Sequence, residues 1–374
     1  MYKGIRKLVL LGAGPAHLEV LLRLARQHPA DLDVTLVCPH PFHISAAMVP
    51  RFVAGGVSLE ECQVPLEPLF KAAGVRWVQG RCESIDAGQR RLKVAGDPGL
   101  GLPYDVLGLD TGADPGRQRL EADIPGAATH ALLTRPLAQF TALWPRVVEL
   151  AQQRPLSVGV VGAGRSAIEL ALAAHERLSG SRFTLLTGGG EIAPHAPAPL
   201  RQRVAEALKR RNITVLRAAC TGVAKGELRM EGDATLACDV PLLAVGGLAP
   251  AWMSGSGLAQ DADGHALIES GLNSASHPEV FIAPDLGHRT GEHCGGDARA
   301  QRAASLMAGN VLAAIEGVAP RNFPVCTNEL LLWSCGARRA FAQWGPLGAQ
   351  GRLPGWWKNR RDKAALRHSR SGHY

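Results

Sequence analysis

Gly12-Ala13-Gly14-Pro15-Ala16-His17 and Gly162-Ala163-Gly164-Arg165-Ser166-Ala167 are two glycine turns about 150 residues apart in a chain of 374 residues. Each follows an apolar run, Leu8 to Leu11 or Val158 to Val161, and each opens a segment whose apolar residues have helical spacing. The first glycine allows the tight turn, the second lets a pyrophosphate approach the main chain, and the helix offers free N–H groups. The sequence therefore predicts two strand-turn-helix units, each suited to a dinucleotide.

Both units depart from the full fingerprint. His17 and Ala167 stand where a third glycine is usual, and alanine is the common substitute of the two. An acidic residue normally ends the second strand and bonds the adenosine ribose, but here those positions are Cys38 and Thr187. Glu191 is a candidate replacement in the second unit; alternatively, that unit has lost tight nucleotide binding. The sequence shows no arginine cluster for a 2′-phosphate, which favours NADH and leaves NADPH open.

Composition indicates a globular protein that folds in a reducing compartment. The chain is 46% hydrophobic and 20% charged, and it contains no apolar stretch of the roughly 20 residues that span a bilayer. Its eight cysteines include no Cys-x-x-Cys pair, so we expect neutral thiols in the cytosol and no redox disulfide. His288, His293 and Cys294 match no common metal spacing, and we expect no metal.

The formal charge of +8 is concentrated near the C-terminus. From Arg338 onward many lysines and arginines face the single acid Asp362, and Trp344, Trp356 and Trp357 lie among them. Tryptophan beside clustered cations suits an anionic membrane surface better than nucleic acid. We therefore do not expect nucleic acid as a partner. The alternative is a solvated basic tail.

Further segments resemble the two-dinucleotide flavoproteins of the pyridine nucleotide-disulfide oxidoreductase superfamily, over essentially the whole chain. Tyr104 to Ala113 and Asp239 to Gly246 resemble the turns that close the two nucleotide domains. His277 to Asp285 resembles the late strand whose aspartate bonds the flavin, and Ala300 to Ser305 resembles the helix under the flavin ring of type II NADH dehydrogenases. The C-terminal segment Leu331 to Lys358 looks most like the flavoprotein module found fused to selenide, water dikinase.

The resemblance implies FAD in the first unit and NADH, with NADPH open, in the second. For FAD it indicates Gly12, Gly14, Pro15, Ala16, His17, Cys38, Cys82, Thr111, Gly112 and Asp285. For NAD(P)H it indicates Gly162, Gly164, Arg165, Ser166, Glu169, Thr187 and Gly246.

The same resemblance indicates where electrons leave. Ala300, Gln301 and Ala304 correspond to a quinone site, although Ser305 replaces its second glutamine. Glu169 is the candidate for positioning the nicotinamide. His43, in the loop that replaces the disulfide helix, is a candidate proton relay because histidine titrates near neutrality, or it caps a turn or contacts phosphate.

These inferences predict an α/β protein with two Rossmann-like, three-layer ββα domains, the second inserted in the first. Residues 1–115 and 251–317 would form the FAD domain, 116–250 the NAD(P)H domain, and 318–374 a small C-terminal unit that contacts a membrane surface or a partner.

The predicted function is an FAD-dependent NAD(P)H oxidoreductase that delivers electrons to a quinone-like or other small acceptor, in the cytoplasm or peripherally at the inner face of the membrane. The alternatives are a soluble flavin reductase linked to selenium or sulfur metabolism, and a flavin-binding interaction protein with little turnover. A homodimer is left open.

Overall fold

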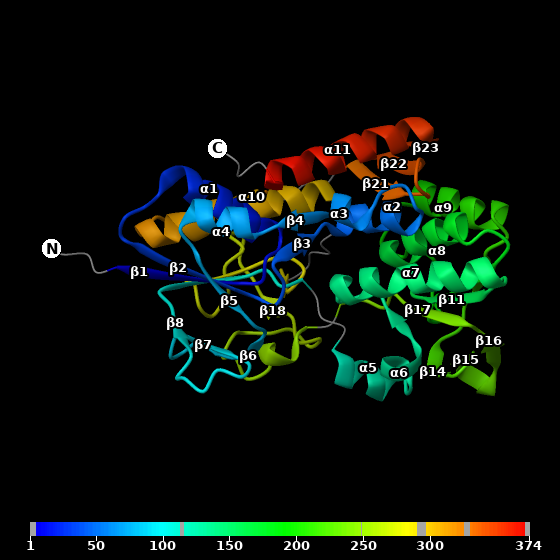
Figure 1. The fold of residues 1–374 in the computed structure, drawn as a ribbon, viewed down its shortest axis with the longest axis horizontal. Coiled ribbons are helices and arrows are strands. Elements are labelled where there is room, and N and C mark those ends of the chain that lie inside the picture. The colour runs from blue at the N-terminus through cyan, green and yellow to red at the C-terminus, as the bar shows by residue number, and fades with distance from the viewer. Residues whose placement is uncertain (1–4, 113–115, 248, 290–296, 325–329, 371–374) are drawn as a thin grey trace.

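The computed structural model describes residues 5–112, 116–247, 249–289, 297–324 and 330–370. Two parallel five-stranded sheets stand side by side along the long axis of the molecule (Figure 1). In each sheet the strand before a glycine turn lies between two parallel neighbours. The predicted α/β class with two Rossmann-like units is confirmed.

The first sheet has the strand order β19-β9-β1-β2-β5. It places residues 280–282 next to residues 106–109, so the chain returns to this sheet after completing the second one. One face is covered by helices, and a three-stranded antiparallel sheet lies below the other (Figure 1). The elements of this unit are β1 (Arg6–Leu11), α1 (Pro15–Gln27), β2 (Leu32–Cys38), β3 (Phe42–Ile44), α2 (Val49–Val53), α3 (Leu59–Cys62), β4 (Gln63–Pro65), α4 (Glu67–Ala73), β5 (Arg76–Gln79), β6 (Cys82–Asp86), β7 (Arg91–Val94), β8 (Leu102–Pro103), β9 (Val106–Leu109), β18 (Ala266–Leu267), β19 (Val280–Ile282), β20 (Gly287–His288) and α10 (Asp297–Glu316).

The second sheet repeats the plan with the order β10-β17-β11-β12-β13 and its own antiparallel sheet, β14-β15-β16. Fully buried aliphatic side chains make the central strand β11 the middle of a second core. The elements are α5 (Arg117–Asp123), α6 (Ala127–His130), β10 (Leu132–Leu133), α7 (Leu137–Gln153), β11 (Ser157–Val161), α8 (Arg165–Arg177), β12 (Arg182–Leu186), α9 (Ala198–Arg210), β13 (Thr214–Leu216), β14 (Cys220–Ala224), β15 (Glu227–Met230), β16 (Thr235–Ala237) and β17 (Val240–Leu243).

The C-terminal segment lies across both units (Figure 1). It forms an antiparallel sheet of β21 (Leu330–Ser334), β22 (Ala340–Trp344) and β23 (Leu347–Gly351), followed by the helix α11 (Arg352–Arg370).

Side chains of this segment enter both hydrophobic cores. Phe341 packs in the second core and Leu366 in the first. Lys358 and Asp362 form a buried ion pair at 2.6 Å, and Lys358 also donates to the Ala47 carbonyl at 3.2 Å. Up to Arg370, therefore, the basic C-terminus is packed structure and not the solvated tail that was the alternative.

His17 explains how the first unit manages without a third glycine. That glycine normally lets the helix approach the sheet closely. Here the imidazole is fully buried, and its Nδ1–H donates to the Gly12 carbonyl at 2.6 Å. A Cβ on Gly108 in β9 would overlap the Nε2 atom of His17. In the usual fingerprint, a glycine in the helix makes room for the close approach of helix and sheet. Here Gly108 in the neighbouring strand β9 makes that room.

Replacing Gly108→Ala should therefore lower the free energy of unfolding by about 1–3 kcal/mol, the usual cost of overpacking a core. In a His17→Ala background the same change should cost less than about 1 kcal/mol, since the clashing ring is gone. Chemical denaturation of the four proteins of this double-mutant cycle measures the difference. An equal cost in both backgrounds would show that Gly108 does not make room for His17.

Candidate functional site

The two glycine turns share one geometric requirement. A Cβ on Gly12 would overlap the backbone carbonyl of Asp110, and one on Gly162 would lie 2.5 Å from the carbonyl oxygen of Ala244. Both residues also have positive φ, +90° and +142°. Each turn thus lies against the end of the neighbouring strand, β9 or β17. A glycine is needed there because a Cβ has no room and because the backbone has positive φ.

The turns differ at their second glycine, where a pyrophosphate would approach. Nothing lies within 4 Å of a Cβ built on Gly164, so the space before α8 is open. A Cβ on Gly14 would overlap the Asp110 carboxylate. Asp110 Oδ2 accepts hydrogen bonds from the backbone N–H groups of Ala16 at 2.8 Å and of His17 at 3.4 Å. In the first unit, a carboxylate therefore takes the place at the helix N-terminus that suits a phosphate.

The environment of Asp110 makes its charge sensitive to pH. Burial raises the pKa of its carboxyl group to about 7, the Ala16 N–H opposes that rise, and the nearby Asp285 carboxylate adds to it. A dinucleotide phosphate at this turn would meet an anion whenever Asp110 is ionised. The backbone fits a pyrophosphate, provided that Asp110 is protonated or turns away.

Arg135 of the second unit reaches the Thr111-Gly112 turn of the first unit, and the sequence prediction missed it. Its guanidinium lies 4.0 Å from the Asp285 carboxylate, and a Cβ on Gly112 would be 3.4 Å from its Nη1. Thr111 closes the same turn, because its hydroxyl donates to the Gly112 carbonyl at 2.9 Å. Arg135 lies in a connection outside every motif, so only the tertiary fold brings this cation to Asp285.

The residues that replace the ribose carboxylates are engaged elsewhere. Cys38 ends β2 with a buried thiol that donates to the His40 carbonyl at 3.3 Å, and burial raises its pKa to about 11. Burial likewise raises the pKa of the Cys82 thiol, at the start of β6, to about 12. The Thr187 hydroxyl donates to the Gly190 carbonyl at 2.6 Å. At neutral pH neither Cys38 nor Thr187 carries the negative charge of the carboxylate that is usual at its position, and the Cys82 thiol, predicted to contact FAD, is also uncharged.

Glu191 has two cationic neighbours that are distant from it in sequence. Its carboxylate lies 3.2 Å from Arg201 and 3.9 Å from Arg217, along a groove of about 710 Å³ beside α9 and β13. Two arginines thus lie beside Glu191, the candidate replacement for the second ribose carboxylate, although the sequence shows no arginine cluster there. One arginine comes from a helix and the other follows a strand, so no local pattern joins them.

Glu169 is buried against the C-terminal sheet. Arg165 Nε pairs with its Oε2 at 2.9 Å, and the Ser334 N–H donates to its Oε1. Arg165 also donates to the Leu332 carbonyl at 3.1 Å. The side chain expected to position a nicotinamide therefore links α8 to β21 by hydrogen bonds. Ser166 and Gly246, which were also predicted to contact NAD(P)H, are exposed.

His43 lies at the first glycine turn. Burial lowers the pKa of its imidazole to about 4, against the opposing effect of its hydrogen bond with the Ala13 backbone. His43 is therefore uncharged at neutral pH, and the near-neutral pKa on which the relay prediction relied is not found.

The predicted acceptor residues of α10 differ in their exposure to solvent. Gln301 is exposed and Ala304 is buried. Ser305, where a second glutamine is usual, accepts a hydrogen bond from Arg23 of α1 at 3.0 Å. The side chain of Ala300 lies outside the described part of the chain. The bond from Arg23 to Ser305 links α10 to α1, and Gln301 is the exposed polar side chain among the three predicted acceptor residues.

Comparison with known proteins identifies related chains. The family model described as pyridine nucleotide-disulphide oxidoreductase matches residues 6–301. The NADH dehydrogenase-like protein YutJ of Bacillus subtilis is 25% identical over 231 residues, which cover 61% of this chain and 62% of YutJ. The type II NADH:quinone oxidoreductase NdhA of Mycobacterium tuberculosis is 27% identical over 318 residues, covering 76% and 66% of the two chains.

The chain thus spans less than two thirds of the length of either relative. Among solved structures, the sulfide:quinone oxidoreductase of Aquifex aeolicus superposes with a TM-score of 0.76 at 16% identity, covering 98% of this chain and 92% of that one. This likeness shows a shared fold that includes the C-terminal segment.

Asp110→Asn should stabilise the protein at pH 8 and change it little near pH 4. In the folded state the Asp110 carboxyl group keeps its proton up to about pH 7, whereas an aspartate in the unfolded chain loses it near pH 4. The stability of the wild type therefore falls as pH rises between these two values. We expect a gain of about 2–4 kcal/mol at pH 8. Denaturation at both pH values tests this, with the exposed Asp31→Asn as the control. A gain that does not depend on pH would contradict it.

Proposed function

The chain belongs to the pyridine nucleotide-disulphide oxidoreductase family, and on that premise we propose that it is an FAD-dependent NAD(P)H oxidoreductase with a quinone-like acceptor. The observation that carries the proposal is the pair of glycine turns, each resting against the end of a parallel strand, with the second turn open. Two nucleotide sites in one chain suit a protein that takes electrons from one cofactor and gives them to another.

The second unit would hold the electron donor. The N-terminus of α8, behind Gly164, offers backbone N–H groups and a partial positive charge to a pyrophosphate. Glu191 can accept hydrogen bonds from the ribose hydroxyls, as carboxylates do in this fold. Arg201 and Arg217 flank it and would also tolerate a 2′-phosphate. NADH therefore remains our proposed donor, with NADPH the alternative.

The first unit would hold FAD through Gly12, Gly14 and Asp285. Bound FAD would supply the two-electron chemistry, and the protein would supply binding and orientation. Asp110 has to give up the N–H groups of Ala16 and His17 to the phosphate, and Arg135 offers compensating positive charge next to Asp285. Flavin should consequently be held more tightly below pH 7 than above it.

The acceptor is proposed to be a quinone because the NdhA relative is named for that reaction. A disulfide route is disfavoured, since the sequence contains no Cys-x-x-Cys pair. Burial raises the pKa of Cys38 and Cys62, the two that lie nearest to the loop containing His43 in sequence. A thiol that stays protonated is a poor nucleophile for disulfide chemistry.

Anaerobic mixing of the purified, FAD-loaded protein with NADH should bleach the flavin absorbance, and adding a soluble quinone should restore it. The same measurement with NADPH ranks the donors, and disulfides and selenium compounds in place of the quinone test other acceptors. Denaturation should release FAD into solution.

Two results would overturn the proposal in different ways. A protein that holds FAD but is not reduced by either nucleotide would be a flavin-binding protein without turnover. Reduction by NADH followed by reoxidation only with a selenium or sulfur compound would favour the soluble reductase. Failure to retain FAD at any pH would remove the flavin assignment itself.

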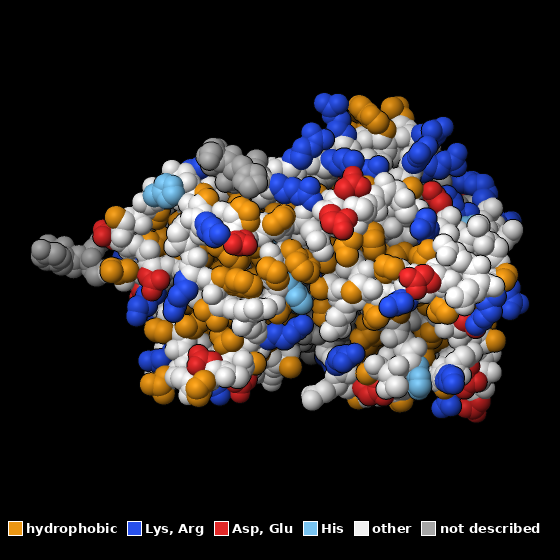
Figure 2. Space-filling model, in the orientation of Figure 1, with side chains coloured by type: hydrophobic (Ala, Val, Ile, Leu, Met, Phe, Trp, Pro, Cys, Tyr) orange, Lys and Arg blue, Asp and Glu red, His pale blue; other side chains and the backbone are white. Residues whose placement is uncertain are grey.

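We further propose that the protein binds an anionic membrane surface through a tryptophan surface at the β22–β23 turn and the start of α11. Its members are exposed apolar side chains, Trp344, Leu347, Leu353, Trp356 and Trp357. Figure 2 shows apolar side chains at the top of the molecule with lysine and arginine on either side. Arg360 lies over the Trp356 ring at 5.6 Å. Within the described residues no helix is long and apolar enough to cross a membrane.

The double change Trp356→Ser and Trp357→Ser should reduce co-sedimentation with phosphatidylglycerol vesicles at least about tenfold, because interfacial binding scales with buried apolar area. The matched control is Leu100→Ser, an exposed apolar residue with 86% exposure on a different loop. Binding should weaken at high salt and on phosphatidylcholine vesicles. Wild-type protein that stays in the supernatant with both lipids would refute the membrane proposal and leave the flavin proposal intact.

A further inference from the structure

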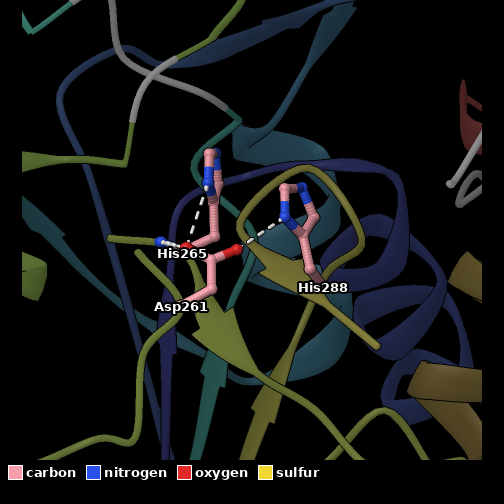
Figure 3. A group of neighbouring side chains, drawn as sticks. All are labelled: Asp261, His265 and His288. Atoms are coloured by element: carbon pink, nitrogen blue, oxygen red, sulfur yellow. Dashed lines mark hydrogen bonds and ion pairs between the residues drawn. The ribbon is translucent and has the colours of Figure 1, made fainter. Parts of the chain in front are cut away.

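Asp261, His265 and His288 come together in the first unit, at the small parallel sheet β18-β20 (Figure 3). His265 directly precedes β18, His288 ends β20, and Asp261 belongs to the turn before β18. We infer that these three side chains form a site for one divalent transition-metal ion of the zinc class, independent of the proposed redox function.

The three side chains already converge. One candidate ligand atom from each lies within 4.8 Å of the other two. His288 Nδ1 is 2.9 Å from one Asp261 oxygen, and His265 Nδ1 is 3.9 Å from the other. A tetrahedral ion with bonds of about 2.0–2.1 Å holds its ligand atoms about 3.3 Å apart. The ligand atoms would therefore have to close by up to about 1.5 Å around an ion.

The burial of His265 and its unpaired ring nitrogen point to a ligand at this place. The residue is only 7% exposed, and its Nδ1 has no hydrogen-bond partner within the described ranges. Buried polar atoms nearly always have a partner, so an unpaired imidazole nitrogen beside a carboxylate suggests a missing one. The two imidazole rings stack with centroids 4.1 Å apart, and Figure 3 shows both on the same side of Asp261.

The donor set selects the class of ion. Two imidazole nitrogens and one carboxylate suit zinc and its neighbours, whereas calcium and magnesium prefer oxygen alone. Asp261 is held in place by the backbone N–H groups of Asp263 and His265, both at 2.9 Å. Such supporting bonds orient a ligand before the ion arrives. The His288 side chain is 41% exposed, which gives an ion a path from solvent.

The site departs from the sequence expectation that the protein binds no metal. That expectation weighed His288 with His293 and Cys294, both of which lie outside the described residues. The actual neighbours of His288 are more than twenty residues earlier in the chain and are joined to it only by the pairing of β18 with β20. Because β20 begins two residues after Asp285, an ion here would also steady the segment that carries the proposed flavin ligand.

The test uses the full chain after treatment with a chelator and titration with ZnCl2 by calorimetry. We expect one ion per chain and a higher unfolding temperature with zinc. His288→Ala and Asp261→Asn should each weaken binding at least about tenfold and abolish the thermal shift. The matched control, His130→Ala, removes an exposed histidine from the second unit and should change neither.

Cobalt then distinguishes this site from the cysteines. Co²⁺ bound by nitrogen and oxygen should give visible absorption without the strong near-ultraviolet band of a thiolate ligand, and His288→Ala should remove it. Absence of stoichiometric binding, a thiolate band, or equal loss in His130→Ala would each overturn the inference. In that case the Asp261–His288 contact is only a hydrogen bond that joins two loops.

Discussion

The architecture depends on the close approach of each glycine turn to the carbonyl end of the neighbouring strand. Gly12 meets the Asp110 carbonyl and Gly162 meets that of Ala244, with no room for a Cβ at either place. This approach directs the first turn of the following helix toward the carboxyl edge of the sheet, where ligands bind in open α/β folds. Both units satisfy the same steric requirement, and in both sheets the strand before the glycine turn is the central one.

Steric similarity does not make the two turns chemically equal. Asp110 fills the first turn with a buried carboxylate, whereas the second turn is open at Gly164. From the sequence motifs alone, the first site had the stronger support and the second the weaker. The geometry differs in the opposite sense, because the space at Gly164 is open whereas the Asp110 carboxylate occupies the N-terminus of α1. Arg135 lies beside the Thr111-Gly112 turn and 4.0 Å from the Asp285 carboxylate.

The C-terminal segment sets the relation between the two units. Arg165 and Glu169 bond the backbone of β21, while α11 is tied to the first unit by the Lys358–Asp362 pair and by bonds from Arg370 to the Gln63 carbonyl. Each of these contacts satisfies a charge or a backbone group that would otherwise be poorly solvated. The same segment leaves Trp344, Trp356 and Trp357 exposed, so it both contacts the two units and offers the surface proposed to meet a membrane.

The sequence by itself determined the two nucleotide-binding units and most of their strands and helices, because apolar periodicity and glycine turns are local properties of the chain. It also indicated Cys38 and Thr187 as the positions where an acidic residue is usual. Only the tertiary structure decided that Asp110 occupies the first turn, that Glu169 bonds the C-terminal sheet, and that Asp261, His265 and His288 meet. These relations join residues from separate strands and helices, and the distance between such residues depends on how the sheets pair and pack.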